Sequence, residues 1–260
     1  MRTKNNNIDF KIIIKTLDDY GLDIFNIQTI AEILKVQDHE IKNYLLTLIK
    51  QKIIYRLENG KFVKHNFRDK YVIGSFLAGD GVISYWSALN FHGLTERFPN
   101  TVFVQSDRKK NPKEIFSVKY QFVHLNPDKL YGHQTEGIMN HQFKITDVEK
   151  TILDCFDKPQ YSGDFADLIK AVSKADLNEE RLIEYSRRIK NLAVIQRIAF
   201  IFDAIGKPKS EKFLKFAKNG LTNTYHYFDV FGEKKGKYNS KWKICYNYEE
   251  KLEDILNSNY

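Results

Sequence analysis

Residues 38–64, DHEIKNYLLTLIKQKIIYRLENGKFVK, join a helical pattern to the signal for a β-hairpin. Asp38 suits the N-terminal cap of a helix. Four apolar residues then recur at the spacing of one helix face: Ile41, Tyr44, Leu45 and Leu48. Two apolar runs flank Asn59-Gly60, a dipeptide that favours a tight hairpin turn. The stretch therefore predicts a helix followed by a hairpin.

Two shorter helical patterns lie upstream of this stretch. Residues 9–20, DFKIIIKTLDDY, carry apolar residues at helical spacing and end before Gly21, a common helix stop. A second short helix is predicted because its apolar residues share one face: Ile27, Ile30, Ala31 and Leu34. Three short helices followed by a hairpin are typical of a winged helix-turn-helix, so we expect residues 1–68 to form a DNA-binding domain of that kind.

The sequence changes character after residue 68. VFVQS (102–106), KYQFVHL (119–125) and GIMNHQFKI (137–145) predict strands, and TDVEKTILDCF (146–156) begins a helix. A helical stretch runs from residue 165 to about 217, and the end of the chain predicts two strands joined by a basic, glycine-containing loop. We therefore expect an α+β protein with a larger, mixed α/β and helical C-terminal domain over residues 69–260. It comprises a sheet-containing part (about 69–158), a helical part (about 159–220) and a basic strand-like end (221–260).

The composition argues against several classes of protein. With 42% hydrophobic and 14% aromatic residues the chain is able to build cores, so it is not disordered. The first residues, MRTKNNNIDF, contain no apolar signal segment, and no apolar run is long enough to span a bilayer, so we expect a cytoplasmic protein without membrane contact. Cys155 and Cys245 lack metal-binding spacing and are expected to be reduced, inert thiols.

The outward side of the helix predicted after Asp38 carries side chains that can read DNA. A step of about 100° per residue places these residues opposite the apolar stripe or at its margins: His39, Lys42, Asn43, Leu46, Thr47 and Lys50. Asn43 could pair with adenine, the lysines could reach guanine or phosphate, and Leu46 could touch a thymine methyl group. Arg56, Lys61 and Lys64 lie on or beside the hairpin, where a wing would meet the DNA backbone. The alternatives are a solvated polar face and, for Leu46, a dimer contact.

Residues 84–94, SYWSALNFHGL, gather serines, aromatic rings and a histidine, and so raise the question of an active site. A serine hydrolase would need a nucleophile framed by glycines, and Ser84 has Ile83 and Tyr85 beside it instead. The stretch also fits a helix with Ser84 as its N-cap and Gly93 as its stop. We therefore expect a packing role, with His92 structural rather than catalytic.

Glu149, Lys150 and Asp154 suggest a metal-dependent nuclease, but their spacing does not fit one, because no residue separates Glu149 from Lys150. The same residues suit a helix start, with Thr146 and Glu149 as a capping box and Lys150 paired with Asp154 one turn later. The chain also lacks glycine-rich phosphate loops and metalloprotease motifs. We therefore expect no enzymatic activity, no catalytic residue, no metal site and no cofactor.

The positive charge of the chain is concentrated near its end. Residues 207–243 hold 10 Lys and no Arg against 3 Asp plus Glu, in a chain of net charge +8. Aromatic residues are interleaved with these lysines, and the alternation in KWKIC predicts that Trp242 points inward while Lys241 points out. This pattern suggests a second polyanion contact, to DNA or RNA, made by four lysines: Lys234, Lys235, Lys237 and Lys241. An ordinary soluble basic surface is the alternative.

Three stretches in this order behind a winged helix resemble the AbiEi family of antitoxins from bacterial abortive-infection, or type IV toxin-antitoxin, systems: ISYWSALNFHGL (83–94), KITDVEKTILDCF (144–156) and YNSKWKICYN (238–247). The similarity extends over nearly the whole chain and is most specific in the ALxxHGL and EKTxLD elements. The chain departs from the family at Val148, where members often have proline before the Glu-Lys pair.

The resemblance implies a transcriptional regulator in phage defence. Its N-terminal domain would bind double-stranded DNA at inverted repeats upstream of its own operon and repress it, as a monomer or weak dimer that binds cooperatively. Residues 69–260 would be an antitoxin domain that counters a nucleotidyltransferase toxin without forming a stable complex. Two other interpretations stay open, namely a metal-dependent nuclease acting through Glu149, Lys150 and nearby carboxylates, and a ligand-sensing transcription factor unrelated to a toxin.

Overall fold

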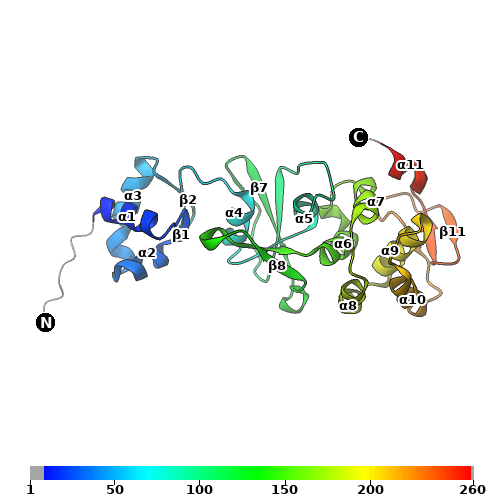
Figure 1. Ribbon diagram of the computed structural model, residues 1–260. Helices are drawn as coiled ribbons and strands as arrows, with labels where there is room; N and C mark the ends of the chain where they lie inside the picture. Colours follow the sequence, from blue (N-terminus) through cyan, green and yellow to red (C-terminus); the bar gives the residue numbers. More distant parts are fainter. Residues whose placement is uncertain (1–8, 259–260) are drawn as a thin grey trace.

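The computed structural model describes residues 9–258 of the chain. Its N-terminal unit, blue in Figure 1, contains three helices and three short strands: α1 (Phe10–Asp19), β1 (Ile24–Asn26), α2 (Ile27–Leu34), α3 (Asp38–Lys50), β2 (Ile54–Glu58) and β3 (Lys61–Lys64). All three helices expected in this region are therefore confirmed. Asp9 caps α1, because its side chain accepts a hydrogen bond of 2.9 Å from the backbone N–H of Ile12.

Helix α3 begins differently from the prediction, because Gln37 and not Asp38 is its N-cap. The backbone N–H of Gln37 donates to Glu40 Oε2 at 2.8 Å. Asp38 is the first helical residue, where a carboxylate still favours the positive end of the helix dipole. The expected apolar stripe is confirmed, with Ile41, Leu45 and Leu48 buried and Tyr44 partly buried.

The hairpin around Asn59-Gly60 is confirmed, and Gly60 has the positive φ of +74° that such a turn requires. Strand β1 pairs antiparallel with β3, so that the sheet has the order β1-β3-β2. This third strand was not predicted, since three residues are too few to display an alternating pattern.

The small sheet is apolar on both faces. Phe25, Ile54 and Phe62 pack against the three helices. The opposite face, with Ile24, Leu57 and Val63, belongs to a hydrophobic cluster that continues into the next part of the chain. The N-terminal unit therefore packs on the rest of the protein through its sheet, and the segment at 66–70 is not a free linker.

The middle of the chain is built on a six-stranded sheet with the order β6-β7-β5-β4-β9-β8. Its strands are β4 (Val82–Ile83), β5 (Thr101–Ser106), β6 (Lys113–Ile115), β7 (Val118–His124), β8 (His133–Glu136) and β9 (Phe143–Thr146). Two helices accompany them: α4 (Lys70–Leu77) and α5 (Tyr85–Phe91). Strands β5 and β7 are parallel and match the predicted VFVQS and KYQFVHL.

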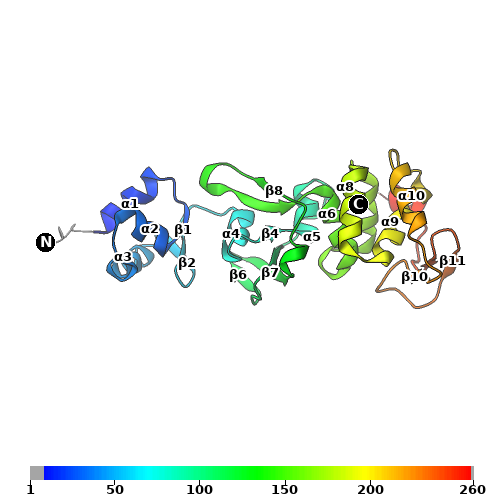
Figure 2. The same ribbon diagram turned by 90° about the horizontal axis from the view of Figure 1, so that it is seen from below.

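The strand expected at 137–145 is only half correct. Residues 137–142 form the turn of a hairpin between β8 and β9, including a short 3-10 helix at Met139–His141. The tip of this hairpin extends to the N-terminal unit (Figure 2). There, Asn140 donates to the carbonyl oxygen of Tyr20 at 2.7 Å, and His141 Nε2 lies 2.9 Å from Asp23 Oδ2.

The helical part of the chain follows β9, as expected. It contains α6 (Val148–Asp157), α7 (Phe165–Lys174), α8 (Glu179–Ile189), α9 (Leu192–Ile205) and α10 (Glu211–Asn219). Helix α6 packs against α5, α7, α8 and α9, and every residue of it from Glu149 to Phe156 is buried. It is therefore the central element that joins the sheet to the helices.

The end of the chain has three short strands rather than the two expected. Strand β12 (Ile244–Tyr246) lies between β10 (His226–Tyr227) and β11 (Lys237–Asn239), parallel to β10 and antiparallel to β11. The basic, glycine-containing loop therefore joins two strands that are not neighbours. Trp242 is buried and Lys241 exposed, as predicted, and helix α11 (Leu252–Asn257) follows.

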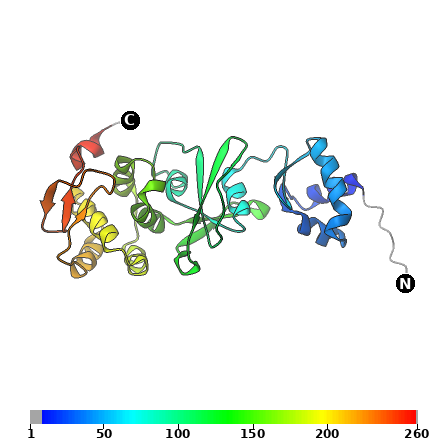
Figure 3. The same ribbon diagram turned by 180° about the vertical axis from the view of Figure 1, so that it is seen from behind.

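The parts of the molecule follow one another in a row, with the N-terminal unit at one end and the C-terminal sheet at the other (Figures 1 and 3). The chain is an α+β protein. Within residues 9–258, every helix is too short or too polar to cross a membrane. Cys155 and Cys245 are both buried and unpaired.

Candidate nucleic-acid interface

The outward side of α3 is exposed as its periodicity predicted. His39, Lys42, Asn43 and Lys50 are exposed, and Leu46 keeps 44% of its surface in contact with solvent. Thr47 is only partly exposed, and its hydroxyl donates to the carbonyl oxygen of Asn43 at 3.1 Å. Thr47 is therefore the member of this face least available to an external partner.

A hollow of about 350 Å³ lies where α3 meets α2 and the hairpin. Four predicted residues line it: His39, Lys42, Leu46 and Arg56. Arg56 is held in place on the hairpin, because its Nη2 donates to Asn59 Oδ1 at 2.7 Å. The structure thus brings the hairpin arginine to the same surface as α3, whereas Asn43, Thr47 and Lys50 lie outside this hollow.

Three further polar residues line the hollow and were not predicted to contact DNA: Gln28, Asp38 and Asn59. Gln28 belongs to α2, and Asn59 was considered only as part of the hairpin turn. Their place beside α3 depends on how α2 and the hairpin pack, which no local pattern reveals. Asp38 places a carboxylate at the edge of a surface that would otherwise favour phosphate.

The side chains of Lys61 and Lys64 are bonded to other parts of the protein and do not line the hollow beside α3. Lys61 Nζ lies 2.9 Å from Glu58 Oε1 and donates to the carbonyl oxygens of Phe76 and Leu77, at 2.8 and 3.0 Å, at the end of α4. Lys61 therefore fastens the hairpin to the middle of the chain. Its contacts do not support the backbone-contacting role expected from the sequence.

Lys64 is likewise occupied, by carboxylates of the N-terminal unit itself. Its Nζ lies 2.9 Å from Asp18 Oδ1 and 3.1 Å from Asp23 Oδ1. Burial disfavours the ammonium, but the hydrogen bonds to Asp18 and Asp23 outweigh it, so the pKa of Lys64 is raised above its usual value. A contact between Lys64 and DNA phosphate is therefore not supported either.

The residues that suggested a nuclease form a closed network around α6. Lys150 and Asp154 make a buried ion pair, and Gln105 Nε2 donates to the second carboxylate oxygen of Asp154 at 2.7 Å. Burial raises the pKa of Asp154 in spite of Lys150. Glu149 accepts from the backbone N–H of Asn178 at 2.7 Å and lies 3.3 Å from Arg181. These carboxylates are thus engaged by other groups of the protein.

The start of α6 differs from the expected capping box. Asp147 is the N-cap and accepts from the backbone N–H of Lys150 at 2.9 Å, while its other oxygen accepts from the Tyr185 hydroxyl at 2.8 Å. The hydroxyl of Thr146 instead meets that of Thr151 at 2.7 Å. Across residues 9–258 the acidic, histidine and cysteine side chains form no group of three that could hold a metal ion.

The SYWSALNFHGL stretch forms α5, and its serines and histidine do not meet. Ser84 occupies the N-cap position, but its side chain makes no capping hydrogen bond. Ser87 donates to the carbonyl oxygen of Thr101 at 3.2 Å and accepts from the backbone N–H of Phe103 at 2.9 Å. His92 Nε2 donates to the carbonyl oxygen of Thr146 at 2.7 Å. These contacts support packing and not nucleophilic catalysis.

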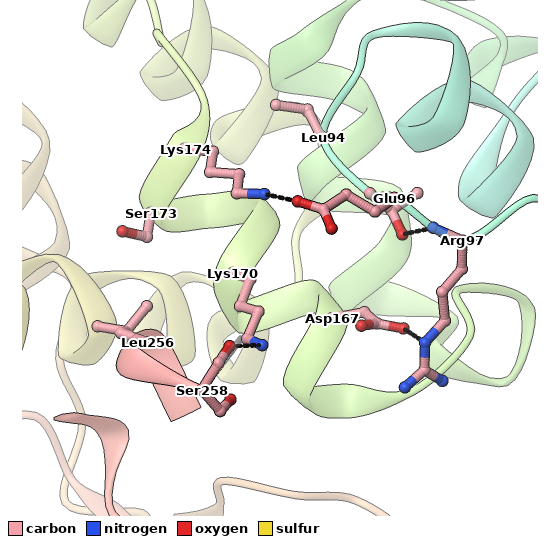
Figure 4. Close-up of a pocket in the computed structure, with 10 residues that line it drawn as sticks. Leu94, Glu96, Arg97, Asp167, Lys170, Ser173, Lys174, Leu256 and Ser258 are labelled. Carbon is pink, nitrogen blue, oxygen red and sulfur yellow. Dashed lines mark hydrogen bonds and ion pairs between the residues drawn. The ribbon is translucent and has the colours of Figure 1, made fainter. Parts of the chain in front are cut away.

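A cavity of about 300 Å³ lies between the loop after α5, helix α7 and the end of the chain (Figure 4). Four of its charged side chains form ion pairs, with Arg97 Nε 3.3 Å from Asp167 Oδ2 and Lys174 Nζ 3.1 Å from Glu96 Oε1. A fifth, Lys170, donates to the carbonyl oxygen of Ser258 at 2.8 Å. Burial raises the pKa of Asp167 although Arg97 opposes this. The cavity is a candidate small-molecule site, and no sequence pattern predicts it, because its lining comes from three separate parts of the chain.

The four lysines predicted to bind a polyanion near the end of the chain fall into two groups. Lys235 Nζ lies 2.6 Å from Glu233 Oε2, and Lys241 Nζ lies 2.7 Å from Asp203 Oδ1. In the part of the chain that the structure describes, Lys234 and Lys237 are exposed and form no ion pair. The structure therefore favours Lys234 and Lys237 for an external contact.

The fold and these surfaces define an α+β protein with a helix that exposes its polar side at one end and a sheet flanked by exposed lysines at the other. No known family profile matches the chain, and no curated protein matches it. Among solved structures it is similar to the crystal structure of the RV2827C protein from Mycobacterium tuberculosis, with a TM-score of 0.65 and 15% identity over 89% of each chain. At this identity the likeness concerns the fold alone.

Proposed function

We propose that the protein is a DNA-binding transcriptional autorepressor and antitoxin of the AbiEi kind, with a winged helix-turn-helix over residues 1–68 and no enzymatic activity. The observation that carries the proposal is the outward side of α3, where Lys42, Asn43 and Lys50 are exposed. Arg56 of the hairpin lines the hollow next to this side. Amide and basic side chains on one exposed helix are suited to read base edges and phosphates in a major groove.

In this proposal α3 enters the major groove and Arg56 contacts the adjacent backbone. The hairpin acts as a rigid wing, because its far side is packed on the middle of the chain through Leu57 and Val63. Phosphate contacts would supply the affinity, and Asn43 the discrimination among base pairs. Inverted repeats would be occupied by two copies, each a monomer or part of a weak dimer, binding cooperatively.

Residues 69–260 would supply the antitoxin activity against a nucleotidyltransferase toxin, acting in the cytoplasm without a stable complex. This part of the proposal rests on the resemblance of the ALxxHGL and EKTxLD elements. Their polar residues support a scaffold and not a reaction, since Glu149, Lys150 and Asp154 are buried and bonded to one another or to their neighbours.

Retardation of the DNA upstream of the protein's own reading frame is the direct test. We expect the full chain to shift this DNA in preference to a scrambled duplex of equal length, and to leave it uncut in a parallel incubation with magnesium. Cleavage would favour the nuclease. Equal binding to both duplexes would contradict the repressor.

The antitoxin role is tested separately, by expressing the chain together with the product of a neighbouring nucleotidyltransferase gene. Rescue of growth supports it, and growth arrest in the presence of folded protein contradicts it. The cavity of Figure 4 favours one alternative, a transcription factor that senses a small molecule. In that case a metabolite extract would change the affinity for the upstream DNA, and a neighbouring toxin gene would be absent.

A further inference from the structure

Two tyrosines on the C-terminal sheet leave large aromatic surfaces in solvent. Tyr238, on β11, is 70% exposed, and Tyr225, directly before β10, is 38% exposed. Their ring centroids are 5.1 Å apart and the rings meet edge to face. An edge-to-face pair leaves ring faces open to a third planar group. In contrast, Ile244 on β12 and Trp242 in the turn before it are buried.

One lysine lies directly beside this pair of rings. Lys243 Nζ lies 5.2 Å from the centroid of the Tyr225 ring. Lys237 precedes Tyr238 on β11, so its side chain leaves the opposite face of the sheet, because successive side chains of a strand alternate. Within residues 9–258, Lys234, Lys237 and Lys243 take part in no ion pair, whereas Lys235 and Lys241 do. The charge next to the tyrosines is thus left for an anionic partner.

The basic loop before β11 is held in a fixed position. Asn247 Nδ2 donates to the carbonyl oxygens of Asp229 and Glu233, at 2.8 and 2.9 Å, and the Tyr227 hydroxyl donates to that of Lys234 at 3.0 Å. A Cβ atom at Gly236 would lie 2.1 Å from the carbonyl oxygen of Tyr246, so the loop runs against β12. A surface ordered before binding loses less conformational entropy when it binds.

We propose that Tyr225, Tyr238, Lys234 and Lys243, here called the C-terminal platform, bind single-stranded nucleic acid. Bases stack on the two rings, and the lysines contact the phosphates that flank them. Aromatic rings accept any base, and lysines follow the backbone, so this chemistry favours an unpaired strand of loose sequence preference. In a duplex the bases are already stacked on one another, so no base is available to stack on the two rings.

The C-terminal platform is distinct from the α3 surface. The two lie at opposite ends of the molecule in Figures 1 and 3. The site is therefore a second nucleic-acid site and not an extension of the helix-reading one, and it does not depend on the function proposed for α3.

Fluorescence anisotropy of labelled strands tests the platform with the full-length protein. The probes are a 12-nucleotide oligouridylate, the matching oligothymidylate, and a 20-base-pair duplex of random sequence, whose lengths are chosen as about one binding site. We expect at least one single strand to bind more tightly than the duplex. The ratio between the RNA and DNA strands then tells which polymer the site prefers.

Tyr225→Ala combined with Tyr238→Ala should weaken single-strand binding by about 5- to 150-fold per lost stacked base. Tyr225→Phe with Tyr238→Phe should bind as the parent does, because the ring is retained. Phe98→Ala is the matched control, since Phe98 is 83% exposed but lies outside the platform. Lys234→Ser with Lys243→Ser should reduce the magnitude of the salt slope by about 0.7 per lost contact, and Lys129→Ser should not.

Three results would overturn the proposal. The first is that the parent protein binds neither single strand. The second is that the tyrosine-to-alanine variant, with an unchanged circular dichroism spectrum, binds single strands as tightly as the parent. The third is that Phe98→Ala loses as much affinity as that variant does. The upstream-DNA shift serves as an internal reference. The tyrosine variants should keep that shift, so failure of the platform and failure of the α3 proposal are read from different assays.

Discussion

His92 Nε2 donates a hydrogen bond of 2.7 Å to the carbonyl oxygen of Thr146. This contact joins the end of α5 to the residue two positions before α6, so the stretches SYWSALNFHGL and KITDVEKTILDCF meet at this hydrogen bond. Thr151 donates its hydroxyl to the same carbonyl oxygen at 3.2 Å. The histidine therefore helps to hold the two helices in their relative positions.

Replacing His92 tests this structural role. Gln at this position carries an amide N–H that can reach the same carbonyl, so His92→Gln should retain stability, DNA retardation and rescue from the toxin. His92→Ala should lose about 1 kcal/mol of unfolding free energy, because one hydrogen bond is removed and Thr151 still serves the carbonyl. Chemical denaturation measures both. A stable His92→Gln protein without any activity would revive a catalytic role for the ring.

Tyr85, and not the larger Trp86, is the fully buried aromatic residue at the start of α5. Tyr85 is 1% exposed and packs against Phe103 and Tyr161, whereas Trp86 is only partly buried at the edge of the same cluster. We expect Tyr85→Ala to lower the unfolding free energy by about 3–5 kcal/mol, the usual cost of deleting a buried aromatic side chain, and Trp86→Ala to cost less. Urea titrations of the two variants would contradict this ranking if Trp86→Ala proved the more damaging.

The helices of the N-terminal unit were predictable because their signals are local. A single stripe of Ile41, Leu45 and Leu48 determines which side of α3 is buried, and the exposed side follows by periodicity. The second apolar face of the small sheet was not predictable in the same way. A β-bulge between Arg56 and Glu58 interrupts the alternation on β2, so the direction of Leu57 cannot be read from its neighbours.

The part of the candidate site on α3 was predictable from the sequence, and the part on the hairpin was not. The residues of α3 lie as expected, because one helix fixes their directions. The lysines of the hairpin do not, because their partners come from elsewhere in the chain: Asp18 for Lys64, and the end of α4 for Lys61. The exposure of Tyr238 was hidden for the same reason, since an aromatic residue among lysines is equally compatible with a core position.

Leu57 belongs to the cluster shared by the N-terminal sheet and the middle of the chain. Because the cluster is continuous, Leu57→Ala should destabilise both parts together, by about 2–5 kcal/mol. Calorimetry should record a single transition that moves to lower temperature. Leu46→Ala is the matched control, because Leu46 is exposed and should leave the transition in place. Separation into two transitions in the parent protein would contradict the shared core.

Removal of Lys150 from its ion pair with Asp154 should make the free energy of unfolding depend on pH. Burial already raises the pKa of Asp154, and Lys150 opposes that rise. In Lys150→Met the opposing charge is lost, and the buried carboxylate should cost about 3–5 kcal/mol at neutral pH.

The sign of the pH dependence follows from the raised folded-state pKa. Above the pKa of the unfolded chain, the folded state alone carries the cost of an ionised buried carboxyl, and this cost disappears as Asp154 becomes protonated. The deficit of Lys150→Met relative to the parent should therefore shrink as the pH falls from 8 to 5. Lys129→Met, an exposed control, should show no such trend. A deficit independent of pH would mean that lost packing and not the unpaired charge causes it.

Asn43 and Lys42 should separate specificity from general affinity in DNA binding. Both are exposed on α3, but an amide can pair with a base while an ammonium beside the backbone neutralises a phosphate. Asn43→Ala should cost about 1–3 kcal/mol at one base pair of the operator and leave binding to random duplex unchanged. Lys42→Ala should weaken binding to both duplexes and reduce the magnitude of the salt slope by about 0.9.

Lys61→Ser is the matched control for these two variants. Lys61 carries the same charge as Lys42 and belongs to the same unit, but it is bonded to Glu58 and to the end of α4. We therefore expect Lys61→Ser to lower the melting temperature without altering the salt slope. Retardation assays over a range of salt concentrations measure all three proteins. If Lys61→Ser changed the slope and Lys42→Ala did not, the hairpin and not α3 would be the part that meets the DNA.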